Sequence, residues 1–337
     1  MGIAILLVVF FHTEMVFRNP VLRAVQEYGY GGVDIFIFAS GIGCYYSLHA
    51  NANPAEFIKR RVVKIMPTYL CFMIVWLIYK KTFFEMSITS MIGNLFCVQN
   101  FTYKGNEFNW YVSAMWLMYL LAPFLTALAD RLDNWKKILA TMALLLLFTV
   151  SFWYSYTYII TIVRIPIFFL GILVAKKASE GLLLKRLHVW LLSLASGAGM
   201  VLLVLLNRWI PDKIWLVGGL WYPFIAIVPG LCLLISLACA RLEAVRGGRM
   251  LVGLLTGLGK RTFEVYLIHI FVFDIFYNIL LQKGLCSGNN LNWFLLVVPI
   301  GAGCVLLVLA VKGMKGLYKK LENRGKASKE AAALAER

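Results

Sequence analysis

A histidine that directly follows a long apolar run is the first residue of this chain that could do chemistry. Residues 2–11 read GIAILLVVFF, and His12 comes next. An imidazole titrates near neutral pH, so it can take a proton from a substrate hydroxyl. A titratable ring at membrane depth needs a partner or a water-filled cavity, and such a residue is a functional candidate by default. We therefore interpret His12 as a candidate general base.

Two carboxylates could orient this imidazole. Glu14 lies only two residues beyond His12, so the two side chains would point to different faces of one helix. Asp34 follows Gly31 and Gly32 near the start of the next apolar run. We predict Asp34 as the catalytic partner of His12 and place Glu14 among the residues that line the site.

Other polar side chains also lie within apolar runs. Arg164 precedes Pro166, whereas Glu264 and His269 share a run near the C-terminal end. Because charges at membrane depth need partners, Arg164 and Glu264 either line the site or form a structural ion pair. His269 is a further candidate for the lining, and its role stays open at this point.

The composition indicates a membrane protein. Hydrophobic residues make up 61% of the 337 residues and charged residues 15%, and the mean hydropathy is +0.79. A soluble domain of this length does not have such a composition. The opening run has no basic leading segment and no small-residue cleavage site, so it is expected to be a membrane helix rather than a signal peptide.

The apolar runs predict an all-α, polytopic integral membrane protein with about ten transmembrane helices. Residues 87–101 are apolar but too few to cross a bilayer, so we expect them at the interface. The predicted spans are 2–17, 30–48, 65–79, 109–129, 138–156, 158–175, 189–206, 217–240, 262–281 and 291–311.

The basic residues predict the orientation of these spans. Most of the 33 Lys and Arg residues fall in alternate connecting segments and in the tail, which predicts that both termini are cytoplasmic. The net charge of +17 therefore needs no nucleic acid as a partner. We divide the chain into a membrane-embedded domain, residues 1–311, and a basic cytoplasmic tail, residues 312–337, which rests on anionic lipid or is loosely ordered.

The seven cysteines show no metal-ligand spacing, so no metal site is expected, and a disulfide between Cys97 and Cys286 stays open. Aromatic residues gather at the predicted outer ends, where most should form an interfacial belt and a few, Trp110 among the candidates, could stack on a sugar. They are Trp110, Tyr111, Trp153, Tyr154, Tyr156, Tyr158, Trp209, Trp215, Trp221, Tyr222 and Trp293.

Five segments in register carry a family resemblance. They are the opening GIAILLVVFFH, GGVDIFIFASGIGCYYSL (residues 31–48), FIKRRVVKIMPTY (57–69), NWYVSAMWLMYLLAPFL (109–125) and GKRTFEVYLIH (259–269). In this order they resemble the membrane acyltransferase 3 family over essentially the whole chain. The resemblance implies about ten spans in the cytoplasmic membrane and no bound cofactor. It also implies transfer of an acyl group, usually acetyl, from acyl-CoA to a hydroxyl of a surface or lipid-linked glycan.

The resemblance also assigns roles to residues. His12 takes the position of the family's essential first-helix histidine, and the family's arginine eleven positions upstream corresponds here to Met1. Either the first helix is truncated before Met1, which its short cytoplasmic end favours, or this member lacks the arginine. Arg60, Arg61 and Lys64 match an Arg-x-x-Arg pattern with Lys64 in place of the second arginine. Guanidinium groups at the inner surface could bind the phosphates of acetyl-CoA, although an ordinary positive-inside cluster would look the same.

We expect His12 to deprotonate an acceptor hydroxyl that attacks the thioester of acetyl-CoA. The expected partners are acyl-CoA, a glycan or lipid-linked glycan acceptor and membrane lipids. The alternative from another class is a proton-coupled transporter of a small solute or glycan precursor, for which Asp34, Arg164 and His269 would also serve. A transporter predicts repeat symmetry, and none is evident. A purely structural scaffold would leave these polar groups without a use.

Overall fold

The computed structural model describes residues 1–102, 109–152, 160–182, 184–209 and 219–335, with side chains as far as Lys319 except that of Thr102. It is 82% helical, and the described residues contain no strand. The α-helices are α1 (Gly2–Phe11), α2 (Pro20–Glu27), α3 (Gly32–Ala50), α4 (Pro54–Phe83), α5 (Ile88–Leu95), α6 (Gln99–Thr102), α7 (Trp110–Asp130), α8 (Trp135–Val150), α10 (Ile165–Ser179), α11 (Arg186–Trp209), α13 (Phe224–Glu243), α14 (Arg246–Gly259), α15 (Thr262–Ile275), α16 (Asn290–Leu295) and α17 (Val297–Ala335). A 3-10 turn, η1 (Gly29–Gly31), precedes α3, and a π-helical segment, η2 (Phe276–Leu281), follows α15.

Seven helical segments of the described chain are long and apolar enough to cross a membrane, so the chain is an all-α, multi-pass membrane protein. The seven are Gly29–Ala50, Pro54–Phe83, Trp110–Asp130, Arg186–Trp209, Phe224–Glu243, Thr262–Leu281 and Asn290–Lys319. The other three predicted spans, 2–17, 138–156 and 158–175, correspond to the shorter helices α1, α8 and α10. Residues 153–159 lie outside the described part of the chain.

Some predicted boundaries were wrong. The third span is not residues 65–79 but the 30-residue helix α4, because the basic residues before it are helix formers that extend the helix toward Pro54. Residues 87–101 form the short helices α5 and α6. The backbone of α17 continues as one helix from Val297 to Ala335, so no break in the helix marks the predicted boundary at residue 312.

Several of the predicted belt aromatics are buried instead. Trp221 is 4% exposed and Trp293 3% exposed, whereas Trp209 is 73% exposed. The first two rings therefore pack inside the protein. The belt candidates Trp153, Tyr154, Tyr156, Tyr158 and Trp215 lie outside the described residues.

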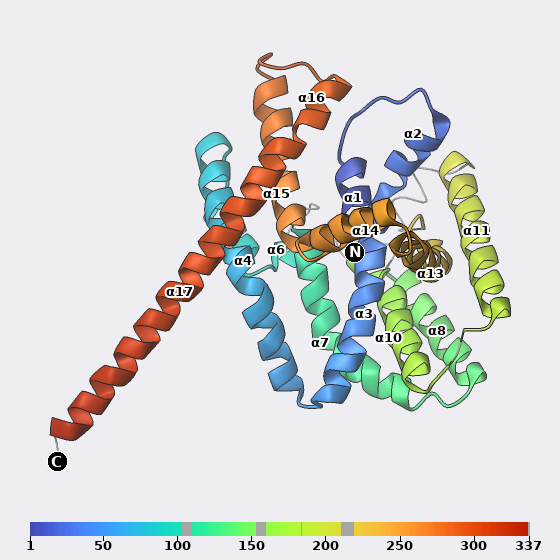
Figure 1. Cartoon of the computed structure of the whole chain (residues 1–337), viewed down its shortest axis with the longest axis horizontal. Helices are drawn as coiled ribbons and strands as arrows, with labels where there is room; N and C mark the ends of the chain where they lie inside the picture. Colours follow the sequence, from blue (N-terminus) through green and yellow to red (C-terminus); the bar gives the residue numbers. More distant parts are fainter. Residues whose placement is uncertain (103–108, 153–159, 183, 210–218, 336–337) are drawn as a thin grey trace. The chain divides into compact units, whose positions relative to one another are not determined.

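The chain forms two compact units. Unit 1 contains Met1–Val62 and Met86–Thr262, and unit 2 contains Val63–Glu85 and Phe263–Arg337. Within unit 1, α3 packs along α10 and also contacts α1, α7 and α13, while α11 packs along α13 (Figure 1). Helix α3 is therefore the central helix of unit 1.

Two glycines allow α3 and α10 to approach closely. A methyl group on Gly41 would overlap the carbonyl oxygen of Phe168, and a methyl group on Gly171 would overlap the carbonyl oxygen of Phe38. Small residues at matching positions let helix backbones touch inside a membrane, where packing rather than the hydrophobic effect holds helices together. In the same helix, Gly43 has no neighbour at the corresponding position.

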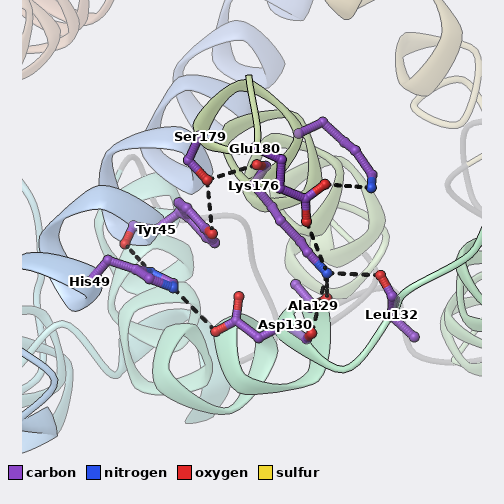
Figure 2. A network of polar contacts seen from close by, with 9 residues as sticks. Tyr45, His49, Ala129, Asp130, Leu132, Lys176, Ser179 and Glu180 are labelled. Atoms are coloured by element: carbon purple, nitrogen blue, oxygen red, sulfur yellow. Dashed lines mark hydrogen bonds and ion pairs between the residues drawn. The ribbon is translucent and has the colours of Figure 1, made fainter. Parts of the chain in front are cut away.

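A polar network joins the C-terminal ends of α3, α7 and α10 (Figure 2). The buried Lys176 ammonium donates to the carbonyl oxygens of Ala129 at 2.9 Å, Asp130 at 3.3 Å and Leu132 at 2.8 Å. Ala129 and Asp130 are the last two residues of α7 and Leu132 lies two residues beyond it, where carbonyls lack the regular intrahelical donors. Lys176 therefore caps α7 from α10.

The outer part of this network is more exposed. His49 stacks on Tyr45 and lies 3.3 Å from the carboxylate of Asp130. Glu180 pairs with Lys176 at 3.5 Å and with Lys177 at 2.7 Å. The hydrogen bond from Lys177 holds the pKa of the Glu180 carboxyl below its usual value, so Glu180 remains a counter-charge for both lysines at neutral pH.

Unit 2 is held by an aromatic cluster and a polar one. Phe271 of α15 lies edge-on to Phe72 and Trp76 of α4. One turn further along α15, Asp274 accepts hydrogen bonds from Tyr79 at 2.6 Å and from Lys80 at 2.9 Å. Lys80 is only 16% exposed because it forms this ion pair with Asp274.

Replacing Gly41 by Ala should destabilise the protein, because the added methyl would meet the backbone of α10. Overpacking of this kind costs about 1–3 kcal/mol, which exceeds the gain of about 0.5–1 kcal/mol from replacing a helical glycine. The matched control, Gly43→Ala, should leave stability unchanged or slightly higher. The midpoint of thermal unfolding of the detergent-solubilised protein measures both. Equal shifts for the two variants would contradict the close contact.

Candidate active site

His12 lies at the C-terminal end of α1, as its capping residue. We expected it inside a span of residues 2–17, but α1 ends at Phe11 and His12 is exposed. Its Nδ1 atom lies 2.8 Å from the carbonyl oxygen of Val8, and its ring lies edge-on to Phe11 with 5.0 Å between centroids. If Nδ1 carries the proton for this bond, Nε2 is the basic nitrogen.

This backbone bond does not by itself mark a catalytic residue. His49 makes the same contact with the carbonyl of Tyr45 at 3.0 Å, and His269 makes it with the carbonyl of Val265 at 2.9 Å. A histidine within or just after a helix can reach the carbonyl four residues earlier, so the contact reflects local geometry. His12 differs from the other two in that its sequence neighbours, Phe11 and Thr13, line a cavity, although His12 itself is not among the lining residues.

That cavity, of about 370 Å³, lies within unit 1 and is lined by both sequence neighbours of His12, Phe11 and Thr13. Gln26 donates to the carbonyl oxygen of Thr13 at 2.7 Å and to its hydroxyl at 3.1 Å. Across the cavity, Asn207 donates to the hydroxyl of Tyr28 at 3.2 Å. These bonds hold amide and hydroxyl groups around a space that could admit a polar ligand.

Asp34 does not orient His12. The carboxylate of Asp34, in the first turn of α3, accepts a hydrogen bond from Arg164 Nε at 3.1 Å. The two side chains are only 1% and 2% exposed. A buried guanidinium needs a counter-ion, and Asp34 supplies it, so the predicted His12–Asp34 pair is wrong. Of the two alternatives left open for Arg164, a structural ion pair is the one observed, with Asp34 as the partner.

Arg164 has further partners that match its burial. It donates to the carbonyl of Ile160 at 2.5 Å, and its guanidinium carbon lies 4.8 Å from the ring centre of Trp110 and 5.0 Å from that of Trp221. Indole faces stabilise a desolvated cation. Trp110, predicted as a lining residue, therefore supports the Asp34–Arg164 pair.

The remaining sequence candidates are placed separately. Glu14 is exposed in the irregular segment after α1. Glu264 lies in the first turn of α15 and His269 is fully buried in the same helix, where it contacts Tyr266 and Phe273 in unit 2. We also missed Asp274, although a carboxylate within the apolar run FVFDIF was a visible signal.

The predicted donor-binding residues lie along α4. Arg60 donates to the carbonyl of Ser47 in the last turn of α3 at 3.4 Å. The Arg61 guanidinium lies over the rings of Phe57 and Tyr119, at 4.9 and 5.2 Å from their centres. Lys64 is exposed one turn further along the helix, in the part that belongs to unit 2. The two arginines are thus anchored within unit 1.

The histidine and the two arginines lie near opposite ends of α3. The turn η1, at the start of α3, contacts α1, whereas Arg60 bonds Ser47 at the other end. A helix of 19 residues is about 28 Å long at 1.5 Å per residue, close to the thickness of the hydrocarbon core of a bilayer. Substrates bound at the two places would therefore approach from opposite ends of unit 1.

Comparison with known families gives one match. The model of the acyltransferase 3 family, described as an acyltransferase domain, matches residues 2–312. No curated protein and no solved structure matches the chain. No group of His, Cys, Asp or Glu residues that could hold a metal ion occurs in the described residues, and none of the seven cysteines forms a disulfide.

Removing one partner of the Asp34–Arg164 pair should be strongly destabilising, because the other charge would remain buried alone. We expect Asp34→Asn or Arg164→Met to cost on the order of 3–5 kcal/mol, and the double variant to cost clearly less than the sum of the two. Thermal unfolding of the solubilised protein, measured as a double-mutant cycle, checks this. Strictly additive losses would show that the two side chains do not act as a pair.

Proposed function

Since the chain belongs to the acyltransferase 3 family, we propose that it transfers an acetyl group from acetyl-CoA to a hydroxyl of a surface or lipid-linked glycan at the cytoplasmic membrane. The observation that carries this proposal is the position of His12. His12 caps α1, and its sequence neighbours Phe11 and Thr13 line a cavity that also holds hydroxyl and amide groups and could admit an acceptor.

In the proposed reaction His12 acts as the general base. Its Nδ1–H stays bonded to the carbonyl of Val8, so Nε2 accepts the proton of the acceptor hydroxyl while the hydroxyl oxygen attacks the thioester carbonyl. The tetrahedral intermediate then expels the CoA thiolate, which takes the proton back from the imidazolium. The products are the acetyl ester and free CoA.

Arg60, Arg61 and Lys64 are proposed to hold the phosphates of the donor. The contact of Arg60 with Ser47 and the stacking of Arg61 on two rings restrict both side chains before a ligand arrives. A guanidinium held in this way can bind a phosphate through two parallel hydrogen bonds with little further loss of freedom. The acyl end of the donor would then extend along α3 toward His12.

A proton-coupled transporter remains the alternative from the sequence, and the family match disfavours it because that family is one of acyltransferases. The structure also gives Asp34 and Arg164 a structural use, as a buried pair. Proton coupling is therefore not needed to explain why these two charged residues are buried.

Replacing Arg60 and Arg61 together by Ala should weaken acetyl-CoA binding by at least about tenfold, because each charged hydrogen bond contributes about 1.5–3 kcal/mol. The loss should be larger at low salt. Lys59→Ala is the matched control, since Lys59 is the neighbouring cation and pairs with Glu56 at an exposed position. Calorimetry on the purified protein measures binding. Unchanged affinity in a folded double variant would remove the two arginines from the donor site.

Replacing His12 by Gln should lower acetyl transfer by about 10²–10⁴-fold, because an amide cannot serve as a general base. Acetyl-CoA binding should be retained. The rate of the unchanged protein should fall as pH drops through the pKa of the ring, since a protonated imidazole cannot accept the hydroxyl proton. Transfer of label from radiolabelled acetyl-CoA in native membranes measures the rate.

The control for His12 is His49→Gln, because His49 makes the same bond to the carbonyl four residues earlier but lies at the other end of α3. It should keep transfer within about twofold. A folded His12→Gln protein that retained transfer to the same extent as His49→Gln would end the assignment of His12 as the base.

A further inference from the structure

A second cavity of unit 1 is an apolar groove between α1, α2, α3, α11 and α13. It has a volume of about 660 Å³, and the described residues that line it are apolar apart from the hydroxyl of Tyr28. Three of these helices, α3, α11 and α13, are long and apolar enough to cross a membrane. The groove therefore lies at a depth where a bilayer supplies hydrocarbon rather than water.

The groove is open on the side formed by α2 and α11. Val21 and Val25 of α2 are 67% and 40% exposed although they line the groove. On α11, the lining residues Met200 and Val204 are 45% and 47% exposed. Within a bilayer, the molecules that can cover such a surface are lipids. A hydrocarbon chain in a groove contacts side chains on several sides, which adds dispersion contacts that a flat lipid-facing surface does not offer.

One row of side chains on α11 leads from the groove to a cation. Met200 and Val204 line the groove, and Arg208 follows Val204 four residues later in the last turn of the same helix. Residues four apart in a helix lie one above the other on one face, with their side chains tilted toward the N-terminus of the helix. Arg208 therefore continues the row of groove residues, and its side chain leans back toward them.

The same end of α11 lies beside α2 (Figure 1). Asn207, the residue before Arg208, donates a hydrogen bond to the hydroxyl of Tyr28 at 3.2 Å, and Tyr28 lines the groove. Arg208 itself is exposed. Glu27 lines the cavity next to Phe11 and Thr13 rather than the groove. Arg208 therefore lies at the mouth of the groove, on the side away from that cavity.

A phosphate is the group that this arginine suits. The end of a membrane helix is the level of the lipid head groups, where basic side chains attract anionic lipids. A guanidinium binds a phosphate through two parallel hydrogen bonds. It would repel the ammonium group of a zwitterionic head group such as phosphatidylcholine. A cation at head-group level, next to a groove at hydrocarbon level, matches the two parts of an anionic phospholipid.

We infer that the groove binds one anionic phospholipid, whose acyl chain lies between α2, α11 and α13 and whose phosphate contacts Arg208. The inference goes beyond the proposed function, because no step of acetyl transfer uses this lipid. The acyl chain fills the space between α2 and the two longer helices. The lipid therefore holds α2 in place against α11 and α13.

The experiment measures lipid binding directly. The full-length protein is reconstituted in nanodiscs of phosphatidylcholine that contain a phosphatidylglycerol probe with a photoactivatable diazirine in its acyl chain. After illumination, the labelled peptides are mapped by mass spectrometry. We expect saturable labelling of α2, α11 and α13, because these helices line the groove. Unlabelled phosphatidylglycerol should displace the probe, whereas additional phosphatidylcholine or inorganic phosphate should not.

Two pairs of variants on α11 test the two parts of the site. Arg208→Gln should lower the labelling about fivefold, the factor that one cation near an anionic lipid contributes. Arg186→Gln removes the same charge at the other end of the helix and should leave the labelling unchanged. Val204→Trp puts an indole into the groove and should abolish most of the labelling. Leu202→Trp is its control, because Leu202 is 48% exposed but does not line the groove.

Several results would overturn the anionic phospholipid. They are labelling spread evenly over all lipid-facing helices, equal displacement by phosphatidylcholine, displacement by inorganic phosphate, and stronger displacement by a polyprenyl phosphate than by phosphatidylglycerol. Equal labelling of Arg208→Gln and Arg186→Gln would also overturn it, because the phosphate would then lie elsewhere. The mapping on the unchanged protein decides the matter if Val204→Trp fails to fold. Since the readout is binding, a protein without acetyl transfer gives the same answer.

Discussion

The ion pair between Asp34 and Arg164 is the interaction on which the arrangement of unit 1 depends. Both side chains are almost fully buried, and the desolvation of each charge costs several kcal/mol. The pair recovers that cost only because Arg164 also bonds the carbonyl of Ile160 and lies between the rings of Trp110 and Trp221. One guanidinium thus connects the start of α3 with the starts of α10 and α7 and the segment before α13.

At the C-terminal ends of α3, α7 and α10, buried Lys176 donates hydrogen bonds to carbonyl oxygens that have too few donors. The last carbonyls of α7 lack the regular donors within the helix, and a single buried ammonium bonds two of them and the carbonyl of Leu132 just beyond the helix. With α3 and α10 in backbone contact at Gly41 and Gly171, α3, α7 and α10 are tied at both ends. The rigid packing of these three helices therefore holds His12 and the pair Arg60 and Arg61 at a fixed distance from each other.

The sequence predicted the class of protein and most of its long helices because both depend on apolar runs, which are local. It failed where the answer depended on which helices meet. Asp34 and Arg164 are 130 residues apart, and a sequence offers Arg164 several carboxylates at membrane depth, so Glu264 seemed as good a partner. The first helix was drawn too long because residues 13–17 are mostly apolar, although Thr13 bonds the carbonyl of Phe10 and the chain leaves the helix there.

The candidate site was predictable only in part for the same reason. His12 could be singled out from its own neighbours, and Arg60 and Arg61 from theirs. The polar cavity could not, because it joins residues from four parts of the chain, and Gln26, Tyr28 and Asn207 are ordinary residues until the fold brings them together. Nor could the sequence show that His49 and His269 share the backbone bond of His12.

The distribution of charge at the two ends of α3 explains how two unlike substrates could be kept apart. The end of α3 next to Arg60 and Arg61 carries two guanidinium groups that would attract a multiply charged donor. The cavity next to Phe11 and Thr13 is lined in part by Glu27, whose carboxylate would repel a phosphate. Like-charge contact of that kind costs several kcal/mol. Under the proposed function, the donor phosphates therefore stay at one end while the thioester, which is neutral, is the part that can reach the histidine.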